Sequence, residues 1–318
     1  MKILVTGGSG TLGGYVLREL LAAHHDVVEY SRSAPRQGGV EFISGDIFEE
    51  GKLTKACRDC GAVIHMAAVP GPGRALPADL INVNVVGTIH ALEAARAAGV
   101  PRFIFASSGA ATGFSYQKHP LLPRYLPIDE EHPSEPHDDY GLSKLLAEGA
   151  CKRYSDAFGM QTVCLRVNHN WYVDRPGAEM AVGTGWAGNL ASVEDLWRRR
   201  YWKVLEDPDG EWPIPGPPPP LNLLWAVTDA RDAAQAFRLA AEKDSIRHEV
   251  LLINSDDTCS FEETLVLLQR HFPDVPLKKK LQGHASLVSH ARASQVLGYS
   301  PRYSWRKSDF RDWMEQVK

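Results

Sequence analysis

Tyr140 and Lys144 stand four residues apart in "DDYGLSKLLAE" (residues 138–148), and such a pair could move a proton. Residues four apart share one face of a helix, so the lysine ammonium can lie beside the phenol. A free tyrosine has a pKa of about 10, and a neighbouring cation lowers it by favouring the phenolate. The same spacing recurs at Tyr303 and Lys307, so spacing alone does not select the pair.

A glycine-rich turn near the amino terminus could hold a dinucleotide. The segment "VTGGSGTLGG" places Gly7, Gly10 and Gly13 at three-residue intervals. An apolar run at 2–6 precedes this turn, and a helical pattern at 11–23 follows it. Residues without Cβ allow a tight turn, which brings backbone N–H groups and the positive end of a helix to a pyrophosphate. The turn therefore predicts dinucleotide binding.

The elements that must position these residues alternate regularly through residues 1–166. Short apolar runs rich in β-branched residues predict strands at 2–6, 26–30, 40–44, 62–66, 102–107 and 161–166. Helical spacing of apolar residues predicts helices at 11–23, 79–98 and 140–158. Continuous apolar strands separated by helices indicate a parallel sheet covered on both faces. We expect an α/β fold with a Rossmann-like, doubly wound sheet.

Residues 167–318 differ in composition from the first 166, with frequent tryptophan and a proline-rich stretch at 212–221. We expect a smaller, mixed, mainly substrate-binding lobe, from which some segments return to the Rossmann domain. The proline-rich stretch is either an ordered loop or a lid. Regular structure is expected again in helices at 229–242, 260–271 and 291–297 and in a strand at 249–254.

The bulk composition excludes several classes of protein. The chain has 318 residues, of which 44% are hydrophobic and 23% charged, and a net charge of −4 gives no electrostatic case for nucleic acid or an anionic membrane. Five cysteines at irregular spacing suit a reducing compartment, and Cys57 and Cys60 lack the second pair of a zinc site. No apolar run is long enough to span a membrane, and the amino terminus does not resemble a signal peptide. We expect a cytoplasmic protein without a metal.

Taken together and in order, these motifs resemble the extended short-chain dehydrogenase/reductase family, of the NAD-dependent epimerase/dehydratase type. The resemblance rests on the glycine turn, on "VIHMAA" (63–68), "NVVGT" (84–88) and "FIFASSG" (103–109), and on the Tyr140–Lys144 spacing. It continues more loosely through "VTDARDAAQAF" (227–237) and "SQVLGYSPRYSW" (294–305).

The resemblance selects Tyr140 over Tyr303. In the family, the catalytic tyrosine lies some thirty residues beyond a serine or threonine at the end of the fifth strand. Ser108 stands there, and Tyr140 follows it by 32 residues. The family's chemistry implies that Ser108 hydrogen-bonds the substrate oxygen while Tyr140 takes or gives the proton. Lys144 would bind the nicotinamide ribose and lower the pKa of Tyr140. Hydride would pass between a substrate carbon and the nicotinamide, and the two helices at 79–98 and 140–158 would pair in a homodimer.

The end of the second strand bears on the choice of cofactor. Relatives that prefer NAD carry an acidic residue there, whereas this chain has Ser31 followed by Arg32, and Glu29 is too far inside the strand to replace it. A guanidinium in place of a carboxylate suits the 2′-phosphate of NADP, so NADP is favoured and NAD is the alternative. The resemblance places the other cofactor contacts at Gly7, Gly10, Thr11, Leu12, Gly13, Asp46, Ile47, Ala67, Ala68 and Asn84, with Tyr140 and Lys144.

The chain departs from the family at two positions. Gly109 and Ala110 follow Ser108 where the 4,6-dehydratases carry Asp-Glu, which argues against such a dehydratase. Trp225 stands where nucleotide-sugar enzymes commonly carry an arginine for the pyrophosphate, which weakens a nucleotide sugar as substrate. His169, after the sixth strand, is a candidate for contact with the substrate.

Three functions remain open. The first is an oxidoreductase or epimerase acting on a hydroxyl or ketone carbon of a sugar or sugar derivative. The second is an NADPH-dependent reductase of a non-sugar ketone or aldehyde. The third, a cofactor-binding regulator without turnover, is disfavoured because Ser108, Tyr140 and Lys144 are all present.

Overall fold

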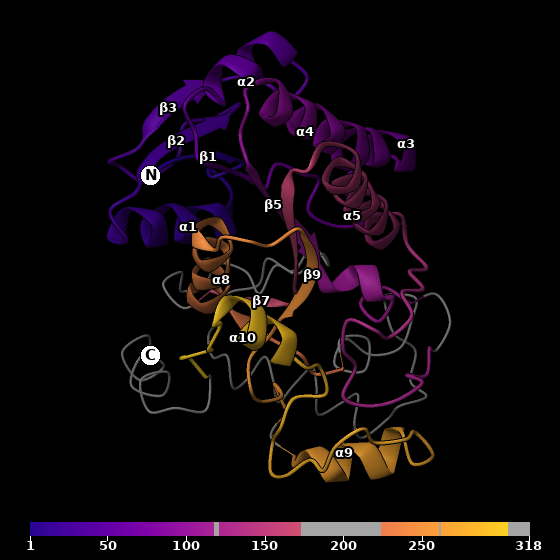
Figure 1. The fold of residues 1–318 in the computed structure, drawn as a ribbon. Helices are drawn as coiled ribbons and strands as arrows, with labels where there is room; N and C mark the ends of the chain where they lie inside the picture. The colour runs from indigo at the N-terminus through magenta and orange to yellow at the C-terminus, as the bar shows by residue number, and fades with distance from the viewer. Residues whose placement is uncertain (118–120, 173–223, 261, 305–318) are drawn as a thin grey trace.

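Seven parallel strands form the central sheet, in the order β3-β2-β1-β4-β5-β6-β9 (Figure 1). The structure is a computed structural model that describes residues 1–117, 121–172, 224–260 and 262–304. The strands are β1 Lys2–Thr6, β2 Asp26–Ser31, β3 Glu41–Ser44, β4 Ala62–His65, β5 Arg102–Ser108, β6 Gln161–Val167 and β9 His248–Ile253. The order reverses between β1 and β4, and the doubly wound sheet predicted from the sequence is confirmed.

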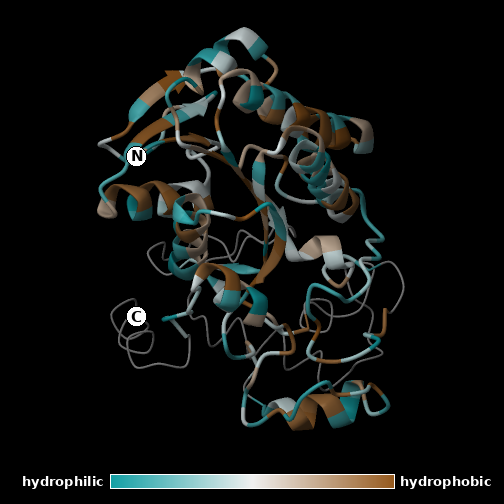
Figure 2. Cartoon of the chain, in the orientation of Figure 1, coloured by the Kyte–Doolittle hydropathy of each residue, from teal (hydrophilic) through white to brown (hydrophobic). Residues whose placement is uncertain are grey.

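Helices cover both faces of this sheet (Figure 1). On one face lie α1 (Thr11–Ala22), α8 (Ala230–Glu242) and α10 (Ala291–Leu297), which share a buried apolar cluster with the strands. On the other face lie α2 (Glu50–Ala56), α4 (Gly87–Ala97) and α5 (Asp139–Phe158), with a cluster of their own. Figure 2 shows the strands between them as predominantly hydrophobic. Burial of the strands on both faces explains their continuous apolar runs.

The helix expected at 79–98 is built from three consecutive pieces. These are α3 (Pro77–Ile81), a π-helical segment (Asn82–Val86) and α4. A π-helical turn inside a helix is frequent at functional sites. Its residue Asn84 is buried and belongs to the wall behind the cleft described below.

Helix α5 begins and ends where the sequence dictates. Asp138 caps its first turn by accepting a hydrogen bond from the backbone N of Gly141 at 2.8 Å. Gly159 ends it in the left-handed region, with a φ of 71°. Tyr140 therefore lies in the first turn, and Lys144 lies one turn later on the same side.

Part of the chain beyond residue 167 returns to the Rossmann domain. Strand β9 pairs with β6 as the seventh strand, and α8 packs against α1. Two short strands, β7 (Asn170–Trp171) and β8 (Thr228–Asp229), pair beside the main sheet. Helix α9 (Thr264–His271) belongs to a third apolar cluster at the far end of the molecule (Figure 1). The proline-rich stretch at 212–221 lies outside the described residues.

The segment that contains Tyr303 is docked on α8. The backbone N atoms of Arg302 and Tyr303 donate to the carboxylate of Asp232 at 2.9 and 3.0 Å. The guanidinium of Arg231 lies 3.4 Å from the centre of the Tyr303 ring. Tyr303 is thus packed against α8 and does not line the cleft, while Lys307 lies outside the described residues.

Among the helices in the described ranges, none combines the length and the apolar composition that crossing a membrane requires.

Candidate active site

The carboxyl ends of β1, β2, β4, β5 and β6 open into one cleft with a volume of about 640 Å³. Open α/β sheets bind their ligands at this edge. The cleft brings together nearly every site residue expected from the sequence. Those that line it are Gly7, Gly10, Thr11, Leu12, Gly13, Ser31, Arg32, Asp46, Ile47, Ala67, Ala68, Ser108, Tyr140, Lys144 and His169.

The glycine turn has the shape that a pyrophosphate requires. Gly7 has a φ of +76°, and a Cβ there would lie 2.7 Å from the backbone N of Ala67. A Cβ on Gly13 would collide with the backbone of Gly7 and Gly8. Gly10 caps α1 without a side-chain hydrogen bond, and the first turn of α1 carries no acid, which leaves its N–H groups for an anion. The residues present therefore fit a dinucleotide.

Glu29 stabilises the glycine turn through a hydrogen bond to its backbone, a role that the sequence did not predict. It is fully buried in β2, and its Oε1 accepts a hydrogen bond from the backbone N of Ser9 at 3.0 Å. Burial raises the pKa of this carboxyl, while the nearby donor groups of Ser31 and of the Ser9 and Gly8 backbone oppose the shift. Glu29 is not among the residues that line the cleft. As expected, it does not replace the acid missing at position 31.

Arg32 stands exposed at the adenosine end of the cleft. Its guanidinium makes no hydrogen bond or ion pair with the residues that the structure describes. The neighbouring Ser31 hydroxyl donates to the carbonyl oxygen of Ser33 at 2.7 Å. Within the described residues, the end of β2 thus presents an unpaired cation and a hydroxyl to the cleft.

Asn84 lies one layer behind the cleft, where we expected direct contact with the cofactor. Its Oδ1 accepts from the backbone N of Val69 at 2.7 Å, and its Nδ2 donates to the carbonyl oxygen of Val69 and to Ser143 Oγ at 3.1 and 3.0 Å. Val69 itself lines the cleft. The amide therefore acts on the cleft by fixing the loop after β4 to α5.

Ser108, Tyr140 and Lys144 meet in the middle of the cleft. Ser108 ends β5, and its Oγ accepts a hydrogen bond from the backbone N of Ala110 at 3.1 Å. A hydrogen bond between Ser108 and Tyr140 favours the phenolate. Lys144 is 3% exposed, and its Nζ lies 5.6 Å from the centre of the Tyr140 ring. The three side chains predicted to act together therefore lie together.

The electrostatics of Tyr140 differ from the expectation. Burial raises the pKa of Tyr140 to about 12, against the smaller effect of Ser108, and Asp138 raises it further. The Lys144 ammonium donates to the carbonyl oxygen of Ala106 at 2.8 Å rather than to the phenol. In the protein alone, the expected lowering of the Tyr140 pKa by Lys144 is therefore absent, and the phenol is protonated at neutral pH.

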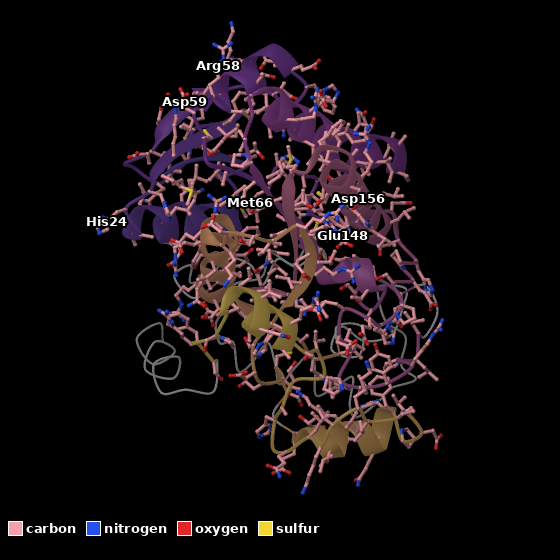
Figure 3. The ribbon with its side chains drawn as sticks, viewed as in Figure 1. His24, Arg58, Asp59, Met66, Glu148 and Asp156 are labelled. Carbon is pink, nitrogen blue, oxygen red and sulfur yellow. The ribbon has the colours of Figure 1, made fainter. Side chains whose placement is uncertain are left out.

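Lys144 is itself perturbed. Burial lowers its pKa to about 8, and the carboxylate of Glu148 opposes this shift. Glu148 lies one turn further along α5, where it is labelled in Figure 3. Its Oε1 accepts from Ser107 Oγ at 2.5 Å and from Arg166 Nε at 2.8 Å, and its Oε2 accepts from Arg166 at 2.7 Å. This buried ion pair ties α5 to β5 and β6 and places a negative charge near Lys144.

The lining of the cleft also includes Arg74, Tyr116, His169 and Asn170, from the segments that follow β4, β5 and β6. The rings of Tyr116 and Tyr140 meet edge to face, with their centres 6.2 Å apart. Burial lowers the pKa of His169 to about 4, so this imidazole is neutral at pH 7. Its Nδ1 and the Oδ1 of Asn170 are buried without a hydrogen-bond partner in the described part of the chain. Buried polar atoms without a partner are uncommon, which makes the segment after β6 a candidate for contact with a ligand.

The two departures from the family pattern have structural counterparts. A Cβ at Gly109 would overlap the side-chain oxygen of Asn168, so an acid at this position would need a different neighbour. Trp225 is 3% exposed, and its ring packs against His271 and Phe272 in the third apolar cluster. The side chain at position 225 therefore supports the core and does not reach the cleft.

Comparison with known proteins identifies the family. The sequence profile of the NAD dependent epimerase/dehydratase family matches residues 3–253. The chain belongs to this family. The match confirms the resemblance derived from the sequence and shows a family of enzymes.

Individual relatives differ in the reaction that their names give. A UDP-glucose 4-epimerase of Rhizobium meliloti is 32% identical over 221 residues, which cover 64% of this chain and 63% of that protein. A uronate dehydrogenase of Pseudomonas putida is 32% identical over 174 residues, which cover 54% of this chain and 61% of that protein. The chain thus spans about three fifths of the length of these relatives.

Among solved structures, MoeE5 in complex with UDP-glucuronic acid and NAD aligns with a TM-score of 0.69 at 21% identity, over the full length of both chains. At this identity the alignment shows a shared fold. It confirms the Rossmann-like architecture independently of the sequence motifs.

Proposed function

We propose that this protein is an NAD(P)-dependent oxidoreductase or epimerase that transfers hydride at a hydroxyl or ketone carbon of a sugar or sugar derivative. The observation that carries the proposal is the meeting of Ser108, Tyr140 and Lys144 in the same cleft as the glycine turn. The epimerase and the dehydrogenase among its relatives both act on sugars by name, which supports a sugar as substrate. Trp225, which is buried away from the cleft, argues against binding of a diphosphate at that position.

In the proposed reaction, each side chain of the site has a separate role. A bound nicotinamide would supply or accept the hydride. Ser108 holds the substrate oxygen by a hydrogen bond and Tyr140 exchanges a proton with that oxygen. Because the Tyr140 phenol is protonated at neutral pH, it is ready to act as the acid when a carbonyl is reduced. Lys144 stabilises the phenolate that remains, and the cofactor is held by the glycine turn and by Ala67 and Ala68.

Two features favour NADP over NAD in this proposal. Arg32 offers a guanidinium that is unpaired within the described residues at the adenosine end of the cleft, and Ser31 replaces the acid that would repel a phosphate. The same two residues support the second candidate function, in which NADPH is consumed to reduce a non-sugar ketone or aldehyde.

A cofactor assay separates these functions. The purified protein is incubated with candidate sugars, or with simple ketones and aldehydes, and with NAD, NADP or their reduced forms. Net formation or loss of the reduced cofactor identifies an oxidoreductase, and isomer formation without net redox change identifies an epimerase. Turnover of non-sugar carbonyls alone would replace the first candidate with the second. The absence of both signals across the panel would contradict the proposal.

The pH dependence of the reduction rate should show the titration of Lys144. Below its pKa of about 8 the side chain is an ammonium that stabilises the developing phenolate, and above it this stabilisation is lost. We therefore expect kcat/KM for reduction to be level near neutral pH and to fall as the pH rises above about 8. Lys144→Arg should remove this fall, whatever its effect on the absolute rate, because a guanidinium remains charged up to a pKa above about 12. A profile of the same shape in both proteins would assign the titration to another group.

The outer side of α4 and α5 supports the proposal of a homodimer. Val86 and Ile89 on one helical stretch, and Leu142 and Leu146 on α5, are large apolar residues left exposed. Light scattering should give about twice the 35.1 kDa of one chain, and Leu146→Asp should reduce the mass toward one chain. The matched control is Leu265→Asp, which adds the same charge to an equally exposed leucine on α9. A single-chain mass for the unaltered protein would contradict the proposal.

A further inference from the structure

Arg74 is a cation that lines the cleft and has no role in the mechanism proposed above. It lies in the loop between β4 and α3, is exposed, and lines the cleft beside Tyr116 and Tyr140. It makes no hydrogen bond, ion pair or ring contact with the residues that the structure describes. Burial raises the pKa of the Tyr116 phenol, and the Arg74 guanidinium partly opposes this rise, which shows that the two groups interact electrostatically.

Among the residues that the structure describes, no carboxylate forms an ion pair with Arg74. Asp46 is the one acidic residue among the described residues that line the cleft, and it lies at the adenosine end, beside Ile47. Asp138 also raises the pKa of Tyr116, but it is not among the residues that line the cleft. Its carboxylate caps α5, and burial raises the pKa of this carboxyl. Among the described residues that line the cleft, the cations Arg32, Arg74 and Lys144 therefore outnumber the acids.

Two buried polar atoms belong to side chains that line the same cleft as Arg74. His169 Nδ1 and Asn170 Oδ1 have no hydrogen-bond partner within the described residues. The imidazole is neutral at pH 7, because burial lowers its pKa to about 4, so it contributes hydrogen bonding and no charge. Among the described residues, a ligand beside Tyr116 and Tyr140 meets the Arg74 guanidinium together with neutral polar groups and the Lys144 ammonium. Such a site suits a polyhydroxy compound that carries a single anionic group.

We infer that Arg74 binds a carboxylate of the substrate, and that the substrates of this protein are sugar acids rather than neutral sugars. This inference rests on the proposed function and narrows its substrate class. A guanidinium presents two parallel N–H donors that match a planar carboxylate. A phosphate on the sugar would satisfy the same cation, so a sugar phosphate is the competing ligand.

The test compares substrates that differ at one group. Oxidation rates are measured with glucose and glucuronate, with galactose and galacturonate, and with glucose 6-phosphate and UDP-glucose, each with NAD and with NADP. A charge-assisted hydrogen bond contributes roughly 1.5–3 kcal/mol, so kcat/KM should favour each acid over its neutral sugar by about ten- to a hundred-fold. Arg74→Gln should abolish this preference mainly through KM, and Arg74→Lys should restore part of it.

The control variant is Arg58→Gln, which removes an equally exposed guanidinium from the outer edge of the molecule (Figure 3). It should leave both the rates and the preference for acids unchanged. Glucose 6-phosphate turned over in preference to the acids, or a preference for acids that survives Arg74→Gln, would overturn the inference. Equal rates with acids and neutral sugars would overturn it as well, while leaving the proposed function intact.

A binding measurement separates failure of the inference from failure of the proposed function. Glucuronate and galacturonate are titrated calorimetrically into the cofactor-saturated protein and into its Arg74→Gln variant. Binding that depends on Arg74 without turnover of any sugar would support a carboxylate site at Arg74 and contradict the proposed activity. Absence of binding to the unaltered protein would overturn the inference.

Discussion

Replacing Tyr140 with phenylalanine is expected to lower turnover by about 10²–10⁴-fold, the usual contribution of a general acid or base. The substitution keeps the ring that packs against Tyr116 and leaves the cap of α5 intact, because that cap comes from Asp138. It removes the one atom of this side chain that can carry the proton. Cofactor affinity should stay within a few-fold of its original value, since the glycine turn and Arg32 are untouched. Steady-state rates and cofactor titration on the same preparation measure the two effects.

The matched control is Tyr303→Phe, which deletes the same atom from the other tyrosine followed by a lysine at four residues. Tyr303 packs beneath Arg231 on α8 and does not line the cleft, so its loss should leave turnover within a few-fold. Full activity in Tyr140→Phe with an authentic substrate would show that the residue is only part of a helix. Equal losses in both variants would point to a general loss of stability.

The strands and the glycine turn could be predicted from the sequence because their signals are local. A strand buried on both faces is an unbroken apolar run, and the run at 2–6 became β1, Lys2–Thr6, without change. The position of Ser108 followed from its place at the end of the fifth strand. The resemblance to the short-chain dehydrogenase/reductase family predicted that Ser108, Tyr140 and Lys144 act together, and all three line one cleft.

What the sequence did not predict depends on three-dimensional neighbours. Asn84 was expected at the cofactor, but its amide is used by the loop at Val69. Glu29 looked like an ordinary strand residue, and only the folded glycine turn shows that it holds the N–H of Ser9. Arg74 lies in a loop without periodicity, so its place beside Tyr116 had no signal in the sequence.

The pKa of Tyr140 is a further property that the sequence did not predict, because it depends on three-dimensional neighbours. Spacing along the helix predicted the proximity of Lys144, and this is confirmed by the 5.6 Å between its Nζ and the ring centre. Spacing could not predict that burial outweighs the charge, or that the ammonium is bound by the carbonyl oxygen of Ala106. A cation changes a pKa according to its geometry and its competitors, and these are properties of the fold.

Replacing Arg32 with alanine is expected to weaken NADP by about ten- to a hundred-fold while changing NAD affinity little. NADP presents a 2′-phosphate to the lost guanidinium, and a hydrogen bond to a charged group contributes roughly 1.5–3 kcal/mol. Neither hydroxyl of the NAD ribose offers a charge for Arg32 to bind, so the loss should be selective. Fluorescence titration of both reduced cofactors into both proteins measures the ratio.

The control for this prediction is Arg36→Ala, which removes another exposed arginine from the same loop, one that does not line the cleft. It tests whether the general positive charge of the loop is sufficient to attract NADP. Because a charge exposed to water is screened by salt, a non-specific effect should appear equally in Arg32→Ala and Arg36→Ala and fade as salt is added. A direct contact should appear in Arg32→Ala alone and persist in salt. Tighter binding of NAD than of NADP by the unaltered protein would reject the assignment, since Ser31 and Arg32 would then not act as the structure places them.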